Sequence, residues 1–265
     1  MPLAVAELPL ASLKSHYEEA GFVLTPAILP LDLVQRAVAA MDAVIGGTYE
    51  TRIPPQCRTW NPGDHPGKIC KIDNAQVSNR SLLELVSHPA IGRWAAQVTG
   101  ARRVQVWSTQ LLFKPPGGEA AGNVGWHQDQ QYWPYWQGEV FTAWIALSDV
   151  TPASGPVRFV RGSHHWGQRA GGNFFDGDLL ALRDNMNLPE GSAWDEAEGE
   201  LSPGAMSFHH CLTIHGSGPN RSAEPRRSMA LHLRTEKSSK VKGVNDYGYA
   251  TRLDDPGHSP ILFDL

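Results

Sequence analysis

The second part of the chain consists of short segments that alternate apolar and polar residues, and this pattern constrains the fold more than any other feature. The segments are RVQVWSTQLLF (103–113), VFTAWIALSDV (140–150), PVRFV (156–160), AMSFHHCLTIH (205–215) and SMALHLRTE (228–236). A period of two is typical of β-strands, and Pro, Gly, Asn and Ser separate the segments. Many short strands without helices between them predict an antiparallel sandwich or barrel.

The first hundred residues have helical periodicity instead. LASLKSHYEEAG (10–21) and LDLVQRAVAAMDAVIGG (31–47) carry apolar stripes and end in glycine, and FVLTPAIL (22–29) between them predicts a short strand or an extended link. SLLELVSHPAIGRWAAQVTG (81–100) predicts two helices interrupted at His88 and Pro89. Residues 48–75 predict a long loop, and residues 165–203 predict an insertion between strands.

The chain length suits a single domain, because 265 residues can bury one sizeable core. We therefore predict a mainly β protein with flanking helices that forms one domain over residues 1–265. Its helical part spans about 1–100, its β core about 102–236 and a C-terminal tail 237–265.

Charge and composition argue against several kinds of partner. The net charge is −4 and no block of like charge occurs, so a nucleic-acid partner is not expected. No run of 18 apolar residues could cross a membrane, and the N-terminal stretch MPLAVAELPLASLKSH lacks the basic region of a signal peptide. Three cysteines without a C-x-x-C pair indicate a reducing, cytoplasmic location.

One aromatic stretch, GWHQDQQYWPYW (125–136), holds a histidine and an aspartate two positions apart. On an extended segment the side chains of His127 and Asp129 would point the same way and could reach one metal ion. A lone H-x-D pair also arises by chance, so a third ligand is needed. His215 supplies it from a distant strand-like run, and two histidines with one carboxylate form a facial triad that leaves positions open on Fe(II).

Arg226 follows His215 by eleven residues and begins the next strand-like segment. Iron(II) with one aspartate carries a charge of +1, and a bound dicarboxylate would lower it to −1. One arginine restores neutrality, and its planar guanidinium matches a carboxylate through two hydrogen bonds. Arg227, its neighbour, is expected to be solvated.

These motifs together resemble one known family. WHQDQQYW, AWIALSDV, GPVRFVRGSH and IHGSGPNRS with Arg226 look like the phytanoyl-CoA dioxygenase family of Fe(II)- and 2-oxoglutarate-dependent oxygenases, over about residues 15–236. The resemblance implies a double-stranded β-helix, which is a cupin-like jelly roll. It also implies iron held by His127, Asp129 and His215.

The same resemblance implies how the co-substrate binds. The keto-acid end of 2-oxoglutarate would chelate the iron, and its far carboxylate would meet Arg226 and the hydroxyl of Ser217. By position in the family, three more residues would line this pocket, namely Gln110, Trp144 and Lys71. Gln110 departs from the family pattern, in which an apolar residue can stand there.

The implied activity is a hydroxylation. The enzyme would use O2 and 2-oxoglutarate to hydroxylate an unactivated C–H bond of a small molecule, releasing succinate and CO2. Halogenating relatives have a small residue where this chain has Asp129, so hydroxylation is favoured over halogenation. Two alternatives stay open: a metal-dependent isomerase or hydrolase on a cupin-like barrel, and a non-catalytic sensor of metal or 2-oxoglutarate.

The residues after Asp129 give a hypothesis for the substrate pocket. Tyr132, Trp133, Tyr135 and Trp136 would form an aromatic wall, although each ring could equally pack against the sheet, and Gln130 or Gln131 would supply a directing hydrogen bond. His210 is expected to face the pocket, whereas His209 and His232 are expected to pack internally. The identity of the substrate and the oligomeric state stay open.

Overall fold

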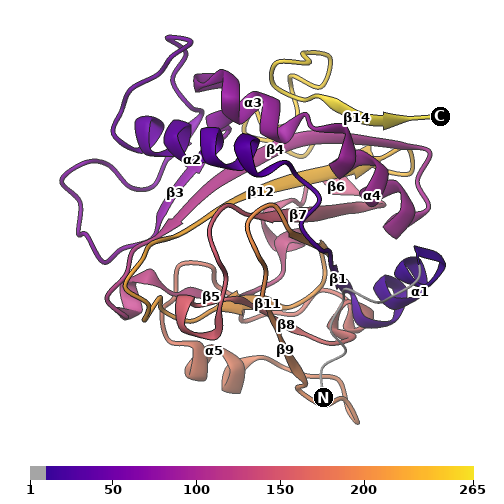
Figure 1. The fold of residues 1–265 in the computed structure, drawn as a ribbon. Coiled ribbons are helices and arrows are strands. Elements are labelled where there is room, and N and C mark those ends of the chain that lie inside the picture. The colour runs from indigo at the N-terminus through magenta and orange to yellow at the C-terminus, as the bar shows by residue number, and fades with distance from the viewer. Residues whose placement is uncertain (1–9) are drawn as a thin grey trace.

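Two antiparallel sheets face each other in the computed structural model, which describes residues 10–265 (Figure 1). The large sheet has, in spatial order, β1 (Phe22–Leu24), β10 (Met206–His210), β7 (Val140–Ala146), β12 (Arg226–Thr235), β4 (Arg103–Lys114), β3 (Cys70–Asp73) and β2 (Cys57–Arg58), with β14 (Ile261–Asp264) also pairing with β4. The first nine residues, which belong to the stretch examined for a signal peptide, lie outside this range.

The small sheet lies below the large one in Figure 1. Its order is β5 (Val124–His127), β11 (His215–Ser217), β8 (Val157–Val160) and β9 (Glu196–Gly199). Two further short strands, β6 (Trp136–Gln137) and β13 (Ser239–Lys240), pair with each other. The mainly β, double-sheet fold expected from the alternating segments is confirmed.

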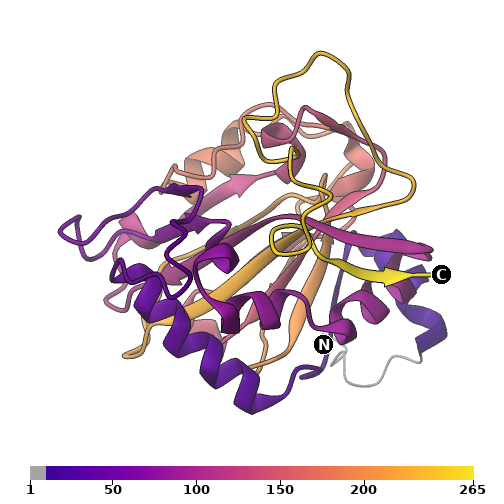
Figure 2. The same cartoon turned by 90° about the horizontal axis from the view of Figure 1, so that it is seen from above.

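Helices cover the outside of the large sheet. In Figures 1 and 2, α2 (Leu31–Ile45), α3 (Arg80–Val86) and α4 (Pro89–Thr99) lie across the face that points away from the small sheet. The predicted break at His88 and Pro89 is confirmed, because His88 caps α4 and Pro89 occupies its first turn. Two more helices, α1 (Leu10–Ala20) and α5 (Leu179–Asn185), flank the sheets.

Strand alternation separates the core from the site. On β12, Met229, Leu231 and Leu233 pack into the main core with the helices. The intervening residues of the same strand include Arg226 and His232, which line a cavity between the sheets. Because side chains on a strand alternate between the two faces, one strand supplies both the core and the site.

Two predictions about the chain path are wrong. Residues 48–75 are not all loop, because β2 and β3 lie in this range and extend the large sheet beyond β4. β3 is buried along its whole length, yet it contains the polar residues Lys71 and Asp73. Because buried strands are usually apolar, the sequence pattern does not indicate this strand. Residues 205–215 form two strands in different sheets, because the chain crosses from β10 to β11 after His210.

The insertion over residues 165–203 contains α5 and ends in β9. It packs against β5 through Gly125, whose backbone N–H donates to the carbonyl of Phe174 at 3.0 Å. A Cβ at Gly125 would overlap the carbonyl oxygen of Asn173 and lie 2.5 Å from that of Asp176. The insertion therefore requires glycine at this position of β5.

Replacing Gly125 with alanine is expected to lower the free energy of unfolding by about 1–3 kcal/mol, because backbone must move to admit the methyl group. Urea unfolding measures this change. Gly46→Ala is the matched control, since Gly46 has φ −69° and its added Cβ would lie 3.4 Å from the nearest atom. Equal stability of G125A and G46A would contradict the expectation.

Candidate metal centre

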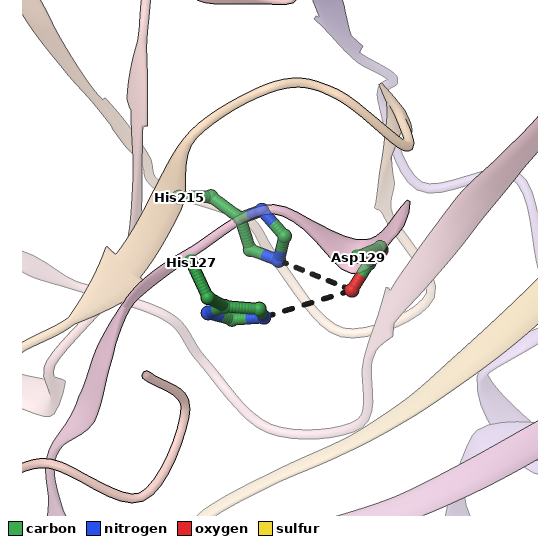
Figure 3. Close-up of side chains that lie close together, drawn as sticks. All are labelled: His127, Asp129 and His215. Carbon is green, nitrogen blue, oxygen red and sulfur yellow. Dashed lines mark ion pairs between the residues drawn. The ribbon is translucent and has the colours of Figure 1, made fainter. Parts of the chain in front are cut away.

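Three side chains converge between the sheets, and their possible ligand atoms lie within 4.8 Å of one another. The Oδ1 atom of Asp129 lies 3.6 Å from Nε2 of His127 and 3.8 Å from Nε2 of His215 (Figure 3). His127 ends β5 and His215 begins β11, and these two residues are direct partners in the antiparallel register. The structure thus brings together the three residues selected from the sequence.

Asp129 reaches this cluster by a route that differs from the prediction. It is not on an extended segment, because the chain enters a 3₁₀-helix at Asp129–Tyr132 immediately after β5. The hydroxyl of Thr142, on β7, donates to Oδ2 of Asp129 at 2.7 Å. Oδ1 is therefore the oxygen that faces His127 and His215.

Backbone carbonyls set the orientation of both histidines. Nδ1 of His127 lies 2.8 Å from the carbonyl oxygen of Gly125, and Nδ1 of His215 lies 2.9 Å from that of Thr213. A carbonyl can only accept, so Nδ1 carries the proton and Nε2 presents its lone pair to the centre. Two imidazole nitrogens and one carboxylate oxygen on one side of a metal fit iron(II).

The local electrostatics keep the ligands in the forms that bind a cation. Burial lowers the pKa of His215 well below its ordinary value, so the neutral ring is favoured. Burial alone would raise the pKa of Asp129, but the neighbouring imidazoles of His215, His127 and His209 outweigh it and hold that pKa well below its usual range. Neutral histidine and ionised aspartate are the states that bind metal.

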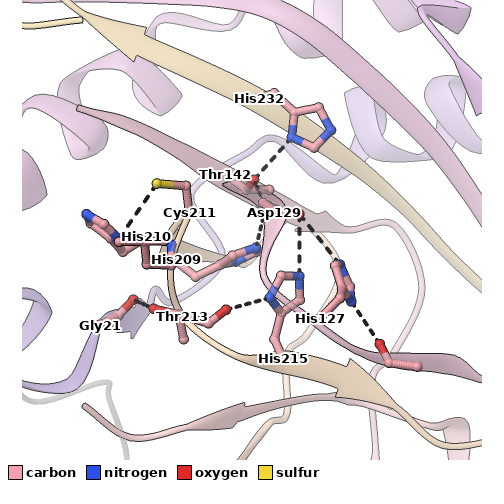
Figure 4. A network of polar contacts seen from close by, with 12 residues as sticks. Gly21, His127, Asp129, Thr142, His209, His210, Cys211, Thr213, His215 and His232 are labelled. Atoms are coloured by element: carbon pink, nitrogen blue, oxygen red, sulfur yellow. Dashed lines mark hydrogen bonds and ion pairs between the residues drawn. The ribbon is translucent and has the colours of Figure 1, made fainter. Parts of the chain in front are cut away.

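Two histidines expected to pack internally lie at the site instead. Nε2 of His209 is 3.5 Å from Oδ2 of Asp129, and neither of its ring nitrogens has a hydrogen-bond partner among the described residues. Nδ1 of His232 lies 3.1 Å from the hydroxyl of Thr142 (Figure 4). Both rings line the cavity around the triad.

His210 does not line this cavity, contrary to the prediction. Its Nδ1 accepts from the backbone N–H of Leu212 at 3.0 Å, and its ring packs beside Tyr17 and His164. Side chains alternate along β10, so His209 faces the site and its neighbour His210 faces away from it.

One cavity extends from the triad toward Arg226, and we call it the arginine cavity. It has a volume of about 40 Å³, and its lining includes Gln110, Trp144, Ser217 and Arg226. The Arg226 guanidinium lies 5.0 Å from the ring centre of Trp144, and its Nε has no hydrogen-bond partner in the described chain. Burial lowers the pKa of Arg226 to about 9, which leaves it charged at neutral pH. Its Nη1 donates to the carbonyl of Gly155, but no carboxylate pairs with it among the described residues. A buried guanidinium without a carboxylate partner fits a carboxylate ligand.

A second cavity, with a volume of about 200 Å³, adjoins the first at His127 and Asp129, and we call it the aromatic cavity. Its walls include Tyr132, Trp133 and Tyr135 of the stretch 125–136. Trp136 is not among its lining residues and packs 5.8 Å from Trp107, ring centre to ring centre. The two cavities share five lining residues, which are Gln110, His127, Asp129, Phe174 and His232.

Three segments outside the motifs complete the aromatic cavity. Residues 48–75 contribute Lys71 and Asp73, the insertion contributes Phe174 and Phe175, and the tail contributes Tyr249. Nζ of Lys71 lies 2.5 Å from Oδ1 of Asp73, whose other oxygen accepts from the hydroxyl of Tyr249 at 2.7 Å. Lys71 therefore lies in this cavity and not among the residues that line the arginine cavity.

The two glutamines of the motif have internal partners. The side-chain amide of Gln130 donates to the carbonyls of Trp133 and Trp136, each at 3.1 Å. That of Gln131 donates to the carbonyl of Gly172 at 3.0 Å. Neither side chain lines a cavity, so these amides shape the wall from behind and Gln130 does not occupy the predicted substrate-facing position.

Lys114 is a site residue that the motif search missed. It ends β4, is fully buried, and its Nζ donates to the hydroxyl of Ser217 at 2.6 Å. Its sequence signal is weak, because a lysine before Pro115 and Pro116 is typical of a solvated turn. Only the pairing of β4 with β12 brings it beside Arg226.

Two facing antiparallel sheets with a buried triad of two histidines and one carboxylate define a jelly-roll oxygenase of the non-haem iron class. The phytanoyl-CoA dioxygenase family model matches residues 17–228. The chain belongs to this family, and it is an iron- and 2-oxoglutarate-dependent dioxygenase.

Curated relatives agree with this assignment. A probable alpha-ketoglutarate-dependent hypophosphite dioxygenase of Stutzerimonas stutzeri is 29% identical over 207 residues, which is 76% of this chain and 69% of the relative. The human peroxisomal phytanoyl-CoA dioxygenase is 23% identical, over 83% of this chain and 67% of its own length.

Solved structures share the fold. The alpha-ketoglutarate-dependent carbocyclase SnoK of nogalamycin biosynthesis has a TM-score of 0.68 and 24% identity, covering 93% of this chain and 91% of its own. The epimerase SnoN, in complex with Fe3+, alpha-ketoglutarate and nogalamycin RO, has a TM-score of 0.68 and 22% identity, covering 89% and 87%. Within residues 10–265 of the present chain, none of the helices has the length and apolar character needed to cross a membrane. The cytoplasmic location stays a prediction.

The burial of His210 on the face of β10 that points away from the site predicts that the stability of the protein depends on pH. Burial lowers the pKa of His210 to about 4 in the folded chain, against about 6.5 when unfolded. Between these two pH values the His210 ring binds a proton in the unfolded chain but not in the folded chain. The contribution of His210 to the free energy of unfolding is therefore complete above pH 6.5 and is lost as the pH falls toward 4. Going from pH 7 to 5 should cost about 1–2 kcal/mol at this residue.

Urea unfolding at both pH values, with a chelator present, measures this loss. His210→Asn removes the titrating ring and keeps an acceptor for Leu212, so this variant should lose less stability than the wild type. The control is His65→Asn, because the side chain of His65 is 63% exposed. An identical pH dependence in H210N and the wild type would show that His210 makes no such contribution.

Proposed function

We propose that the protein hydroxylates an unactivated C–H bond of a small organic molecule, with conversion of 2-oxoglutarate and O2 to succinate and CO2. The observation that carries this proposal is that two adjoining cavities with different linings both reach His127 and Asp129 of the triad. One cavity contains the guanidinium of Arg226, which has no carboxylate partner among the described residues, and the other is walled by aromatic rings. A diacid and a carbon substrate could therefore approach the same metal from different cavities.

Each cavity has residues suited to its role. We propose that His127, Asp129 and His215 hold the iron, which would supply the oxidising chemistry. Arg226 and Ser217 would bind the far carboxylate of 2-oxoglutarate, and Trp144 and Gln110 would form the walls around it. We assign Lys71 to the polar end of the aromatic cavity, where Asp73 already neutralises its charge.

The aromatic cavity supports a compact, largely apolar substrate. The Lys71–Asp73 pair has no net charge, and no other lysine or arginine lines the aromatic cavity within residues 10–265. The phosphates of a coenzyme-A thioester would need more cations than this cavity offers. Hypophosphite, the substrate named for the Stutzerimonas relative, has three heavy atoms and would leave most of the aromatic wall without contacts.

The first experiment measures succinate formation from 2-oxoglutarate by protein loaded anaerobically with Fe(II), after addition of O2. A panel of hypophosphite, acyl-coenzyme-A thioesters and free metabolites identifies the compound that stimulates turnover. His215→Ala is expected to lower turnover by about 100-fold or more, because the metal loses one of its three ligands.

His165→Ala is the matched control for this experiment, because His165 is an exposed histidine. It should retain the turnover of the wild type. Absence of turnover in the wild type with every compound, or equal turnover in H215A and the wild type, would refute the proposed activity.

Tyr132 tests the assignment of the aromatic cavity to the substrate. This side chain is 40% exposed and lines the cavity, so Tyr132→Ala should fold and lose apolar contact with the substrate. The KM for the stimulating compound should rise by about tenfold, which corresponds to roughly half of an aromatic side chain's burial free energy. The KM for 2-oxoglutarate should stay unchanged.

Leu180→Ala provides the comparison, since Leu180 is 66% exposed on α5 and lines neither cavity. Steady-state kinetics with each substrate varied in turn measures both KM values. A rise in the KM for 2-oxoglutarate alone would show that the aromatic wall contacts the co-substrate and not the substrate.

A further inference from the structure

Two buried cations lie directly opposite each other on neighbouring strands. Lys114 of β4 and Arg226 of β12 are register partners, and their side chains are 0% and 1% exposed. Like charges at opposite positions of a sheet destabilise it, and burial without a counter-ion adds to the cost. Within residues 10–265, neither side chain forms an ion pair with a carboxylate.

The neighbouring Arg158, in contrast, has a carboxylate partner. It pairs with Glu196 at 2.9 Å and lies 4.9 Å from the ring centre of Trp126. Lys114 and Arg226 are thus the cations at this end of the site whose charge is left for a ligand. Burial lowers the pKa of Lys114 well below its ordinary value, and the charge of Arg226 lowers it further, so an anion nearby would stabilise the ammonium.

The hydrogen bonds of Lys114 show that it does not itself reach that ligand. Its ammonium has three protons, and Nζ has three acceptors: the hydroxyl of Ser217 at 2.6 Å, the carbonyl of Ser217 at 3.4 Å and the carbonyl of Gly218. Lys114 is also not among the residues that line the arginine cavity. Any effect on a ligand must therefore pass through Ser217 or act through the field of the charge.

The bond to Ser217 determines where the hydroxyl proton points. A serine hydroxyl has one donor and two acceptor positions, and Lys114 occupies an acceptor position. No acceptor for the Ser217 hydroxyl proton occurs among the described residues, and the side chain lines the arginine cavity. The O–H is therefore free to donate into that cavity, beside the guanidinium of Arg226.

We propose that Lys114 is a positioning residue for the co-substrate: it orients the Ser217 hydroxyl as a donor to the distal carboxylate of 2-oxoglutarate and supplies a second buried positive charge behind it. This inference rests on the proposed binding of 2-oxoglutarate in the arginine cavity. Lys114 contacts neither the metal nor the reacting atoms. Its effect should be confined to ligands that have a distal carboxylate.

The test compares two metal chelators by calorimetry on Mn(II)-loaded protein without oxygen. 2-Oxoglutarate has the distal carboxylate, whereas oxalate can chelate the metal but does not extend toward Arg226. Lys114→Met keeps the aliphatic stem and removes the ammonium. It should raise the Kd for 2-oxoglutarate by about fivefold or more and leave the Kd for oxalate within about twofold, since one charge-assisted interaction is worth more than 1 kcal/mol.

Coupling to Ser217 separates positioning from a general loss of structure. Ser217→Ala should also weaken the binding of 2-oxoglutarate and leave the binding of oxalate unchanged. The double variant should bind 2-oxoglutarate no more than about twofold more weakly than K114M, because the effects of two residues that act as a unit do not add. Lys14→Met is the matched control, since the Lys14 side chain is 50% exposed on α1.

Three results would overturn the inference. The first is a change in the 2-oxoglutarate Kd of less than about fivefold in K114M. The second is a rise in the oxalate Kd of K114M that equals the rise in its 2-oxoglutarate Kd. The third is an unchanged 2-oxoglutarate Kd in S217A, which decides the question even if K114M does not fold. Failure of the wild-type protein to bind 2-oxoglutarate would instead contradict the proposed function.

Discussion

The antiparallel pairing of β5 with β11 is the interaction on which the rest of the site depends. It sets His127 directly opposite His215, with ring centres 4.2 Å apart. Both rings are held by carbonyls two residues earlier in their own chain segments, at Gly125 and Thr213. The ligand atoms are therefore positioned by backbone hydrogen bonds, which cost little further entropy when a metal binds.

The opposing sheet supplies the surroundings of this centre. Thr142 on β7 fixes the carboxylate of Asp129, and His232 on β12 bonds to the same hydroxyl. Because alternate residues of β12 and β7 face the helices, the same strands that stabilise the domain also carry the polar groups of the site. The site thus lies on rigid strands, where its geometry is best preserved.

The two cavities differ in whether their polar groups have hydrogen-bond partners. The Nε atom of Arg226 and both ring nitrogens of His209 are buried and unbonded within the described residues. Groups of this kind are costly in a folded protein unless a ligand satisfies them. In the aromatic cavity the polar pair Lys71–Asp73 is already satisfied, which supports our proposal that this cavity selects a substrate by shape and apolar contact.

The sequence by itself determined the cluster of two histidines and one aspartate and the general fold. His127, Asp129, His215 and Arg226 belong to short motifs whose chemistry is specific in combination, and strand alternation shows in the residues themselves. Local order in the chain is enough for such features, because spacing along a strand or helix places side chains on one face.

Only the tertiary structure decided which other residues reach the site. Lys114 lies beside Arg226 because β4 pairs with β12, and Lys71, Phe175 and Tyr249 meet because distant segments converge on one cavity. The place of β10 in the large sheet faces His209 toward the site and His210 away from it, which reverses the prediction for both. Strand pairing and turns between sheets arise from contacts far apart in sequence, so no local pattern of residues could determine them.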